Sequence, residues 1–279
     1  MQLTINHSGS RLSLMRMRMR MRMRMRTAYQ SLLVAILFGM SCMVNADDAL
    51  SQELKFLKDY FNHGDISTMQ KTQIKLRVQK IKWSGINDVE LFDKIETLLL
   101  ASTDETSAEA KAWLLQALAF SGHEKYRPTI SKFVNDTESK KVRRHASKSL
   151  DTLSKFSAWN AVIQANNAGL NRVQLDNQRM SNMIRSDDIE LVRAGASRLY
   201  KLKDPQLAIY DEVAKKIEDN YLGTMSDSDT ANAVAWLCKS LAISGDTKYR
   251  PLLEKVMNAN VHRTVKKWAR KSLQALSEG

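Results

Sequence analysis

The chain has 279 residues, of which 43 are lysine or arginine and 30 are aspartate or glutamate, and its formal net charge at neutral pH is +13. This length is sufficient for one large domain or for a repeat array. The two cysteines exclude a disulfide-rich scaffold, so the fold must depend on apolar packing.

Residues 1–46 have the organisation of a signal peptide. Arginines without any acidic residue extend to Arg26, an apolar stretch follows at 32–40, and the tripeptide Val-Asn-Ala ends at residue 46. This order predicts cleavage before Asp47 and export to the periplasm or the exterior. The apolar stretch has about half the ~20 residues that span a bilayer, so we expect no integral membrane span after cleavage.

Cleavage also changes the charge of the protein. It removes seven arginines and leaves 36 basic against 30 acidic residues, a net charge of +6. Nucleic acid is therefore not expected as a partner, whereas acidic protein surfaces and anionic envelope polymers are. Cys42 allows an alternative lipoprotein signal, and Cys238 is expected to be a small buried apolar residue.

Apolar residues at helical spacing predict an all-α fold. In chain order, the predicted helices cover 48–62, 67–83, 88–101, 107–121, 126–135, 138–155, 188–202, 205–222, 230–244, 249–258 and 260–277. The weakly amphipathic, asparagine-rich residues 157–185 are less regular. Helices are expected to begin at the prolines and to end at particular glycines, as is typical of these residues; the positions are Pro128, Pro205 and Pro251, and Gly122, Gly223 and Gly245.

The second half of the chain repeats the first. Residues 112–153 align without a gap with residues 235–276, and almost half of the aligned residues are identical, including the block Lys-Tyr-Arg-Pro. A weaker match upstream pairs Asp93 with Asp211. A duplicated unit of this size predicts a repeat architecture. The expected organisation is a signal peptide (1–46), an N-terminal arm (47–155), an irregular helical joint (156–186) and a C-terminal arm (187–279).

A recurring pattern, Val-basic-x-x-Ala-x-x-x-Leu, begins at Val142, Val192 and Val265, with Tyr200 in the last position of the second copy. It resembles the HEAT repeat, and the Ser-Gly-x-x-Lys-Tyr-Arg-Pro turn is similar to that of several bacterial exported HEAT-like proteins. The resemblance implies an α-solenoid of about five to six helix pairs with an elongated concave surface for partners. It implies no reaction.

The sequence contains none of the common catalytic or phosphate-binding motifs. Its histidines are scattered, and His145 corresponds to Trp268 in the duplicate, an exchange that a metal ligand would not tolerate. We therefore expect no enzyme, no metal site and no cofactor.

The repeated turn is the best candidate for a binding site. Arg127 and Arg250 present a planar group suited to carboxylate or phosphate, and Tyr126 and Tyr249 could stack on a ligand. The alternative is that each Tyr holds the turn against the preceding helix and each Arg pairs with a nearby acid. Because every repeat needs the same turn, we favour the structural alternative, in which Tyr→Phe is nearly neutral.

Two further candidates are charged and aromatic. Arg143 and Arg144, together with Lys266 and Lys267, occupy corresponding helices and could form a regular basic ridge or merely a solvated face. Trp159, in the irregular joint, could be an exposed anchor.

The predicted function is that of an exported protein-binding scaffold, with another protein as partner. The alternatives are a binder of anionic envelope polymers and an accessory enzyme or lyase subunit.

Overall fold

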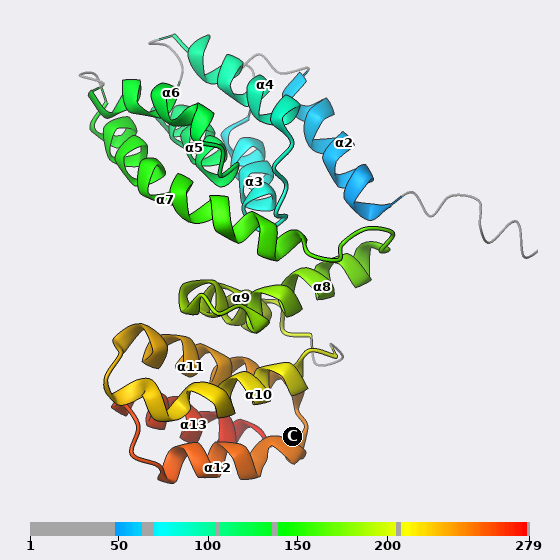
Figure 1. The fold of residues 1–279 in the computed structure, drawn as a ribbon, viewed down its shortest axis with the longest axis vertical. Helices are drawn as coiled ribbons and strands as arrows, with labels where there is room; N and C mark the ends of the chain where they lie inside the picture. The colour runs from blue at the N-terminus through cyan, green and yellow to red at the C-terminus, as the bar shows by residue number, and fades with distance from the viewer. Residues whose placement is uncertain (1–47, 63–69, 104–106, 136–138, 205–207, 278–279) are drawn as a thin grey trace, which may run out of the picture. The chain divides into compact units, whose positions relative to one another are not determined.

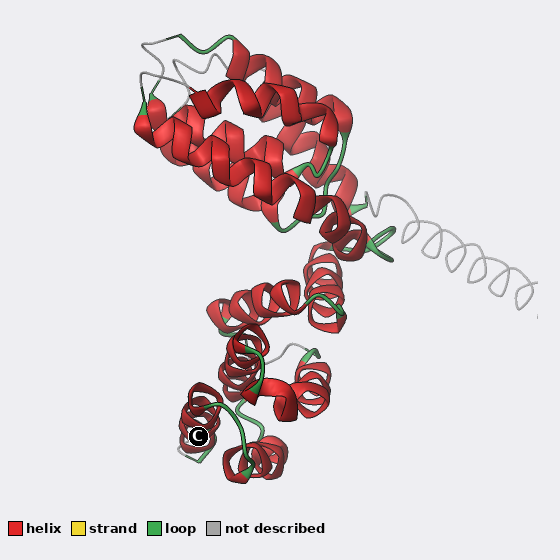
Figure 2. Cartoon of the chain, turned by 60° about the vertical axis from the view of Figure 1, so that its left-hand side comes forward, coloured by secondary structure: helices red, strands yellow, loops and turns green. Residues whose placement is uncertain are grey.

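A computed structural model describes residues 48–62, 70–103, 107–135, 139–204 and 208–277. Throughout these residues the secondary structure is helical, without strands (Figures 1 and 2). The all-α prediction is therefore confirmed. The predicted signal peptide, its cleavage site and Pro205 lie outside the described residues.

The elements follow one another with short connections. The α-helices are α2 (Ala49–Asn62), α3 (Lys71–Lys82), α4 (Val89–Leu100), α5 (Ala108–Phe120), α6 (Arg127–Lys132), α7 (Lys140–Gln164), α8 (Arg172–Arg185), α9 (Ile189–Leu202), α10 (Tyr210–Asn220), α11 (Ser228–Leu241), α12 (Arg250–Asn258) and α13 (Arg263–Ala275). Single 3-10 turns are η1 (Glu124–Tyr126), η2 (Phe133–Asn135), η3 (Tyr221–Met225), η4 (Ala242–Ser244) and η5 (Thr247–Tyr249).

The helices pack mainly on neighbours that are one or two elements away in the chain. Helix α5 lies between α3 and α7, and α11 lies between α9 and α13. Helices α4, α6, α8, α10 and α12 pack on α5, α7, α9, α11 and α13, respectively (Figure 1). The N-terminal helix α2 contacts both α4 and α8. Each odd-numbered helix from α5 to α13 is therefore packed against the even-numbered helix that precedes it in the chain.

Two apolar clusters form the core. The first extends from α2 to α7 and receives Met183 and Leu191 from α8 and α9. The second extends from Met180 on α8 to the end of α13. Ala146 and Ala269, which the duplication aligns, are fully buried, one in each cluster. Helix α8 contributes to both clusters because its side chains point to either side.

Helix ends follow local side-chain chemistry. Pro128 and Pro251 stand in the first turns of α6 and α12, as predicted, where a missing N–H costs nothing. Gly122 and Gly245 adopt positive φ after their helices. The prediction for Gly223 is wrong, because this residue lies within the 3-10 turn η3 and has no positive φ.

The region between the arms is more regular than predicted. The helix expected to end at 155 continues to Gln164, because Phe156, Trp159 and Ile163 prolong its buried face. Helix α8 then begins with a capping box, in which Asn171 and Gln174 exchange side-chain and backbone hydrogen bonds. Asn171 thus caps α8, while Asn160 and Asn167 donate to carbonyl oxygens near the ends of α5 and α7.

Candidate functional site

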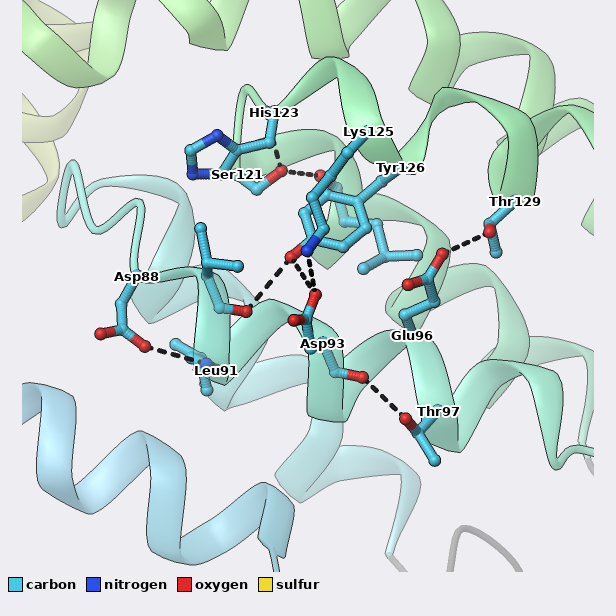
Figure 3. A network of polar contacts seen from close by, with 12 residues as sticks. Asp88, Leu91, Asp93, Glu96, Thr97, Ser121, His123, Lys125, Tyr126 and Thr129 are labelled. Atoms are coloured by element: carbon cyan, nitrogen blue, oxygen red, sulfur yellow. Dashed lines mark hydrogen bonds and ion pairs between the residues drawn. The ribbon is translucent and has the colours of Figure 1, made fainter.

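The Lys-Tyr-Arg-Pro turn of the first arm is closed by a network of polar contacts (Figure 3). The ring of Tyr126 is fully buried; its hydroxyl donates to Asp93 Oδ1 at 2.8 Å and lies 3.2 Å from the Val89 carbonyl oxygen. Lys125 Nζ lies 2.6 Å from the same Asp93 oxygen. Hydrogen bonds from Lys125 and Tyr126 lower the pKa of Asp93, while burial above all raises the pKa of Tyr126.

The second arm repeats this network. Tyr249 donates its hydroxyl proton to Asp211 Oδ1 at 2.8 Å, and Lys248 Nζ lies 3.0 Å from that oxygen. The pKa of Asp211 is lowered, first by Lys248 and then by Tyr249. Asp93 and Asp211 are the residues that the weak upstream alignment pairs. The duplication has therefore kept a Lys–Tyr–Asp lock that ties each turn to the preceding helix pair.

The arginines of both turns also have partners within the chain. Arg127 Nε donates to Glu124 Oε2 at 2.5 Å, and its Nη2 donates to Ser154 Oγ at 2.9 Å. Arg250 lies 3.8 Å from Glu254 and donates to Ser277, the duplicate of Ser154. These contacts are those expected of the structural alternative. The hydroxyl groups of Tyr126 and Tyr249, by contrast, donate to Asp93 and Asp211, contacts that the expectation of a neutral Tyr→Phe change did not include.

The other predicted candidates do not form one site. Arg144 and Lys267 are exposed, and Arg143 and Lys266 are partly buried, on α7 and α13. Trp159 is only 8% exposed, and its indole N–H donates to Asp188 Oδ2 at 2.7 Å. The hypothesis of an exposed Trp159 anchor is wrong, because α7 continues through this residue and turns its ring into the core.

A groove lies on the face of α3, α5 and α9 and has a volume of about 750 Å³. We call it the basic groove. Its charged lining residues are all cations: Lys80, Lys82, Arg172, Arg198 and Lys201. Its apolar and aromatic lining residues are Leu76, Trp83, Trp113, Phe120, Ala194 and Leu202. Among the residues that the structure describes, no carboxylate lines it.

The basic groove continues over α7. A second hollow of about 390 Å³ shares Lys82 and Phe120 with it and adds Lys148 and Lys155. The acid in its lining, Glu190, is 2.5 Å from Lys155 Nζ and is thus neutralised. The positive lining therefore extends from α9 across α3 and α5 to α7.

Cations and aromatic rings lie against each other within the groove. Lys82 Nζ is 4.5 Å from the centroid of the Trp83 ring and 5.4 Å from that of Phe120, distances at which a ring face attracts a cation. The pKa of Lys82 is lowered, first by burial and then by Lys201, and burial also lowers the pKa of Arg198. Burial disfavours the positive charges of Lys82 and Arg198, and the nearby Lys201 further disfavours that of Lys82. An anion bound here would therefore be stabilised.

The second arm presents a related surface on α11 and α13. Lys239 Nζ lies 3.7 Å from the centroid of the Trp236 ring and 3.9 Å from that of Trp268. The duplication places Gln116 and His145 at the positions of Lys239 and Trp268, and these two side chains are 3.2 Å apart. The same face thus carries polar and aromatic side chains in both arms, with different residues.

Comparison with protein-family models, with curated proteins and with solved structures gives no match for this chain. The candidate site must therefore be judged from its own geometry. Within the described ranges, no group of three or more His, Cys, Asp or Glu side chains is placed to hold a metal ion. In the same part of the chain, no helix has the length and apolar character needed to cross a membrane.

The cations of the basic groove were not singled out from the sequence. One available signal was the composition of residues 71–82, in which basic residues occur without any acid. The pair Arg198 and Lys201, one helical turn apart on α9, was a second. Neither signal indicates that α3 and α9 face one groove, since more than a hundred residues separate them.

Proposed function

We propose that this chain is an exported, non-catalytic HEAT-like α-solenoid that binds another protein through the face formed by its odd-numbered helices, α3 to α13. The observation that carries the proposal is the basic groove, which combines unneutralised cations with exposed apolar side chains on that face. A solenoid uses such a face because its helix pairs contact only their neighbours and leave a long continuous surface.

Two features of the packing support the solenoid. The order of helix contacts is local, since α5 lies between α3 and α7 and α11 between α9 and α13. The Lys–Tyr–Asp lock recurs in both arms, and its Tyr–Asp hydrogen bond is 2.8 Å long in each, as expected of a repeated structural unit. Because the repeated turns are occupied by internal contacts, the face of the odd-numbered helices is the better candidate for recognition.

The cationic lining also favours a second candidate, a binder of anionic envelope polymers. Such a protein would recognise repeated charges and would lose affinity steeply with added salt. A purely ionic polymer would make no apolar contacts with exposed leucines. Leu76 and Leu202 are 48% and 50% exposed within the groove, and their presence favours a partner that also offers apolar side chains.

Site-specific photo-crosslinking tests the proposal. Leu202 in the groove is 50% exposed, and Leu100 at the end of α4, outside the groove, is 51% exposed, so the two leucines form a matched pair. A photoreactive residue is placed at each position and the cell envelope is irradiated. We expect discrete protein adducts at Leu202 and none at Leu100. Adducts that are equal at the two positions, or that consist of polymer instead of protein, would refute protein binding by this face.

Export is tested separately by N-terminal sequencing of the protein recovered outside the cytoplasm. We expect the first residue to be Asp47. Recovery of the bulk protein inside the cytoplasm with the N-terminal segment intact would contradict the signal-peptide prediction.

A further inference from the structure

We infer that the basic groove binds an extended acidic segment of the partner protein, in which carboxylate side chains alternate with apolar ones. This inference rests on the proposed function and specifies the chemistry that the partner must present. It follows from three properties of the groove: excess positive charge, accessible apolar side chains, and the continuation of its positive lining into the neighbouring hollow on α7.

The positive charge of the groove is not compensated from within. Lys80 and Arg172 share one carboxylate, that of buried Glu53, at 3.8 Å and 3.1 Å, and the same carboxylate also accepts from Arg179 at 2.7 Å. Asp176 lies 3.0 Å from Arg172 and adds one more negative charge. These two carboxylates pair with three cations, Lys80, Arg172 and Arg179, so a net positive charge remains.

The remaining cations have no described carboxylate in direct contact, and Asp176 and Glu53 act on Arg198 only at longer range. Among the described residues, Lys82, Arg198 and Lys201 form no ion pair, and they lie on α3 and α9, on the two sides of the groove. Lys82 and Arg198 are partly buried, and such cations are stabilised when a ligand supplies a counter-charge. Carboxylates spaced along a bound chain would reach both sides in turn.

Apolar side chains lie among these cations in the lining. Leu76 and Lys82 come from α3, and Leu202 directly follows Lys201 on α9. A purely ionic polymer would leave both leucines in water, whereas a peptide with apolar residues between its acids would bury them. In the neighbouring hollow Lys155 is paired with Glu190, but Lys148 prolongs the positive lining, which suits an extended segment better than a compact ligand.

The test uses three labelled probes and fluorescence anisotropy with the protein lacking residues 1–46. The probes are a short peptide that alternates Glu and Leu, poly-glutamate of the same charge, and dextran sulfate. We expect the alternating peptide to bind most tightly. The variant Lys82→Gln/Lys201→Gln should weaken its binding at least about tenfold, the usual consequence of losing an interaction at the centre of an interface. Leu202→Ser should weaken it by a similar factor.

The matched control is Lys94→Gln/Lys132→Gln, which makes the same charge change at exposed lysines outside the groove and should leave binding unchanged. Equal weakening by this control would overturn the inference, because the attraction would then be non-specific. Equal or tighter binding of dextran sulfate, with Leu202→Ser without effect, would overturn both the inference and the proposed protein partner. If no probe binds although Leu202 crosslinks to a protein, only the acidic character of the segment is wrong.

Discussion

The two glycines of the repeated turn allow backbone strain to be separated from steric exclusion. Gly122 and Gly245 have φ values of +68° and +66°, in the left-handed region that disfavours any Cβ. A Cβ at Gly122 would lie 2.5 Å from the Ser157 nitrogen and 2.6 Å from the Phe156 carbonyl carbon. A Cβ at Gly245 would meet nothing within 4 Å. The two Gly→Ala substitutions therefore share the strain and differ in the space available.

The expected costs follow from these distances. The left-handed conformation costs an alanine roughly 1–2 kcal/mol, and this should be the whole effect of Gly245→Ala. At Gly122 the clashing atoms belong to the backbone of α7, which cannot move like a flexible side chain. Overpacking of this kind adds about 1–3 kcal/mol, so Gly122→Ala should lower the free energy of unfolding by about 2–5 kcal/mol.

Urea denaturation followed by circular dichroism and tryptophan fluorescence gives both values, with unchanged m-values as the check that the same transition is measured. Asparagine tolerates the left-handed region better than alanine, so Gly245→Asn should recover part of the loss while Gly122→Asn should not. Equal losses for the two alanine variants, or a larger loss at Gly245, would refute the close approach of α7 to the first turn.

Four further substitutions test the polar contacts and the packing. Tyr126→Phe removes the hydroxyl that donates to Asp93 and should cost about 1 kcal/mol at neutral pH. Because the folded-state pKa of Asp93 is lowered, the stability linked to this carboxylate is present above the unfolded value of about 4 and is lost as the pH falls through the folded value. The difference between Tyr126→Phe and the parent in denaturation should therefore shrink in acid, and a constant difference would contradict the hydrogen bond. Glu53→Gln removes the charge of a carboxylate whose side chain is 1% exposed and which pairs with a buried arginine; it should cost about 3–5 kcal/mol, and an unaltered melting curve would show that the pair is not formed. Ala146→Leu and Ala269→Leu enlarge two fully buried positions and should each cost about 1–3 kcal/mol; normal urea midpoints would mean that these faces are not packed as described.

The sequence by itself determined the helices and the repeated turns, because these depend on local chemistry. The spacing of apolar residues gives a helix its buried face, and Pro128 and Pro251 fix φ at a helix start. The alignment of the two halves identified the Lys-Tyr-Arg-Pro turn and favoured a structural role for it. It also paired Asp93 with Asp211, although nothing in the sequence indicated that these residues receive the Tyr hydroxyls.

Only the tertiary structure decided which side chains meet across helices. Trp159 lies at a position whose sequence suggests exposure, yet α7 continues past it and the ring packs beside Phe156. The basic groove requires Lys82 of α3 and Lys201 of α9 to face each other although more than a hundred residues separate them. Helical periodicity assigns a residue to a face of its own helix, but the neighbour of that face is set by the packing of the whole chain. For this reason the helices could be predicted and the groove could not.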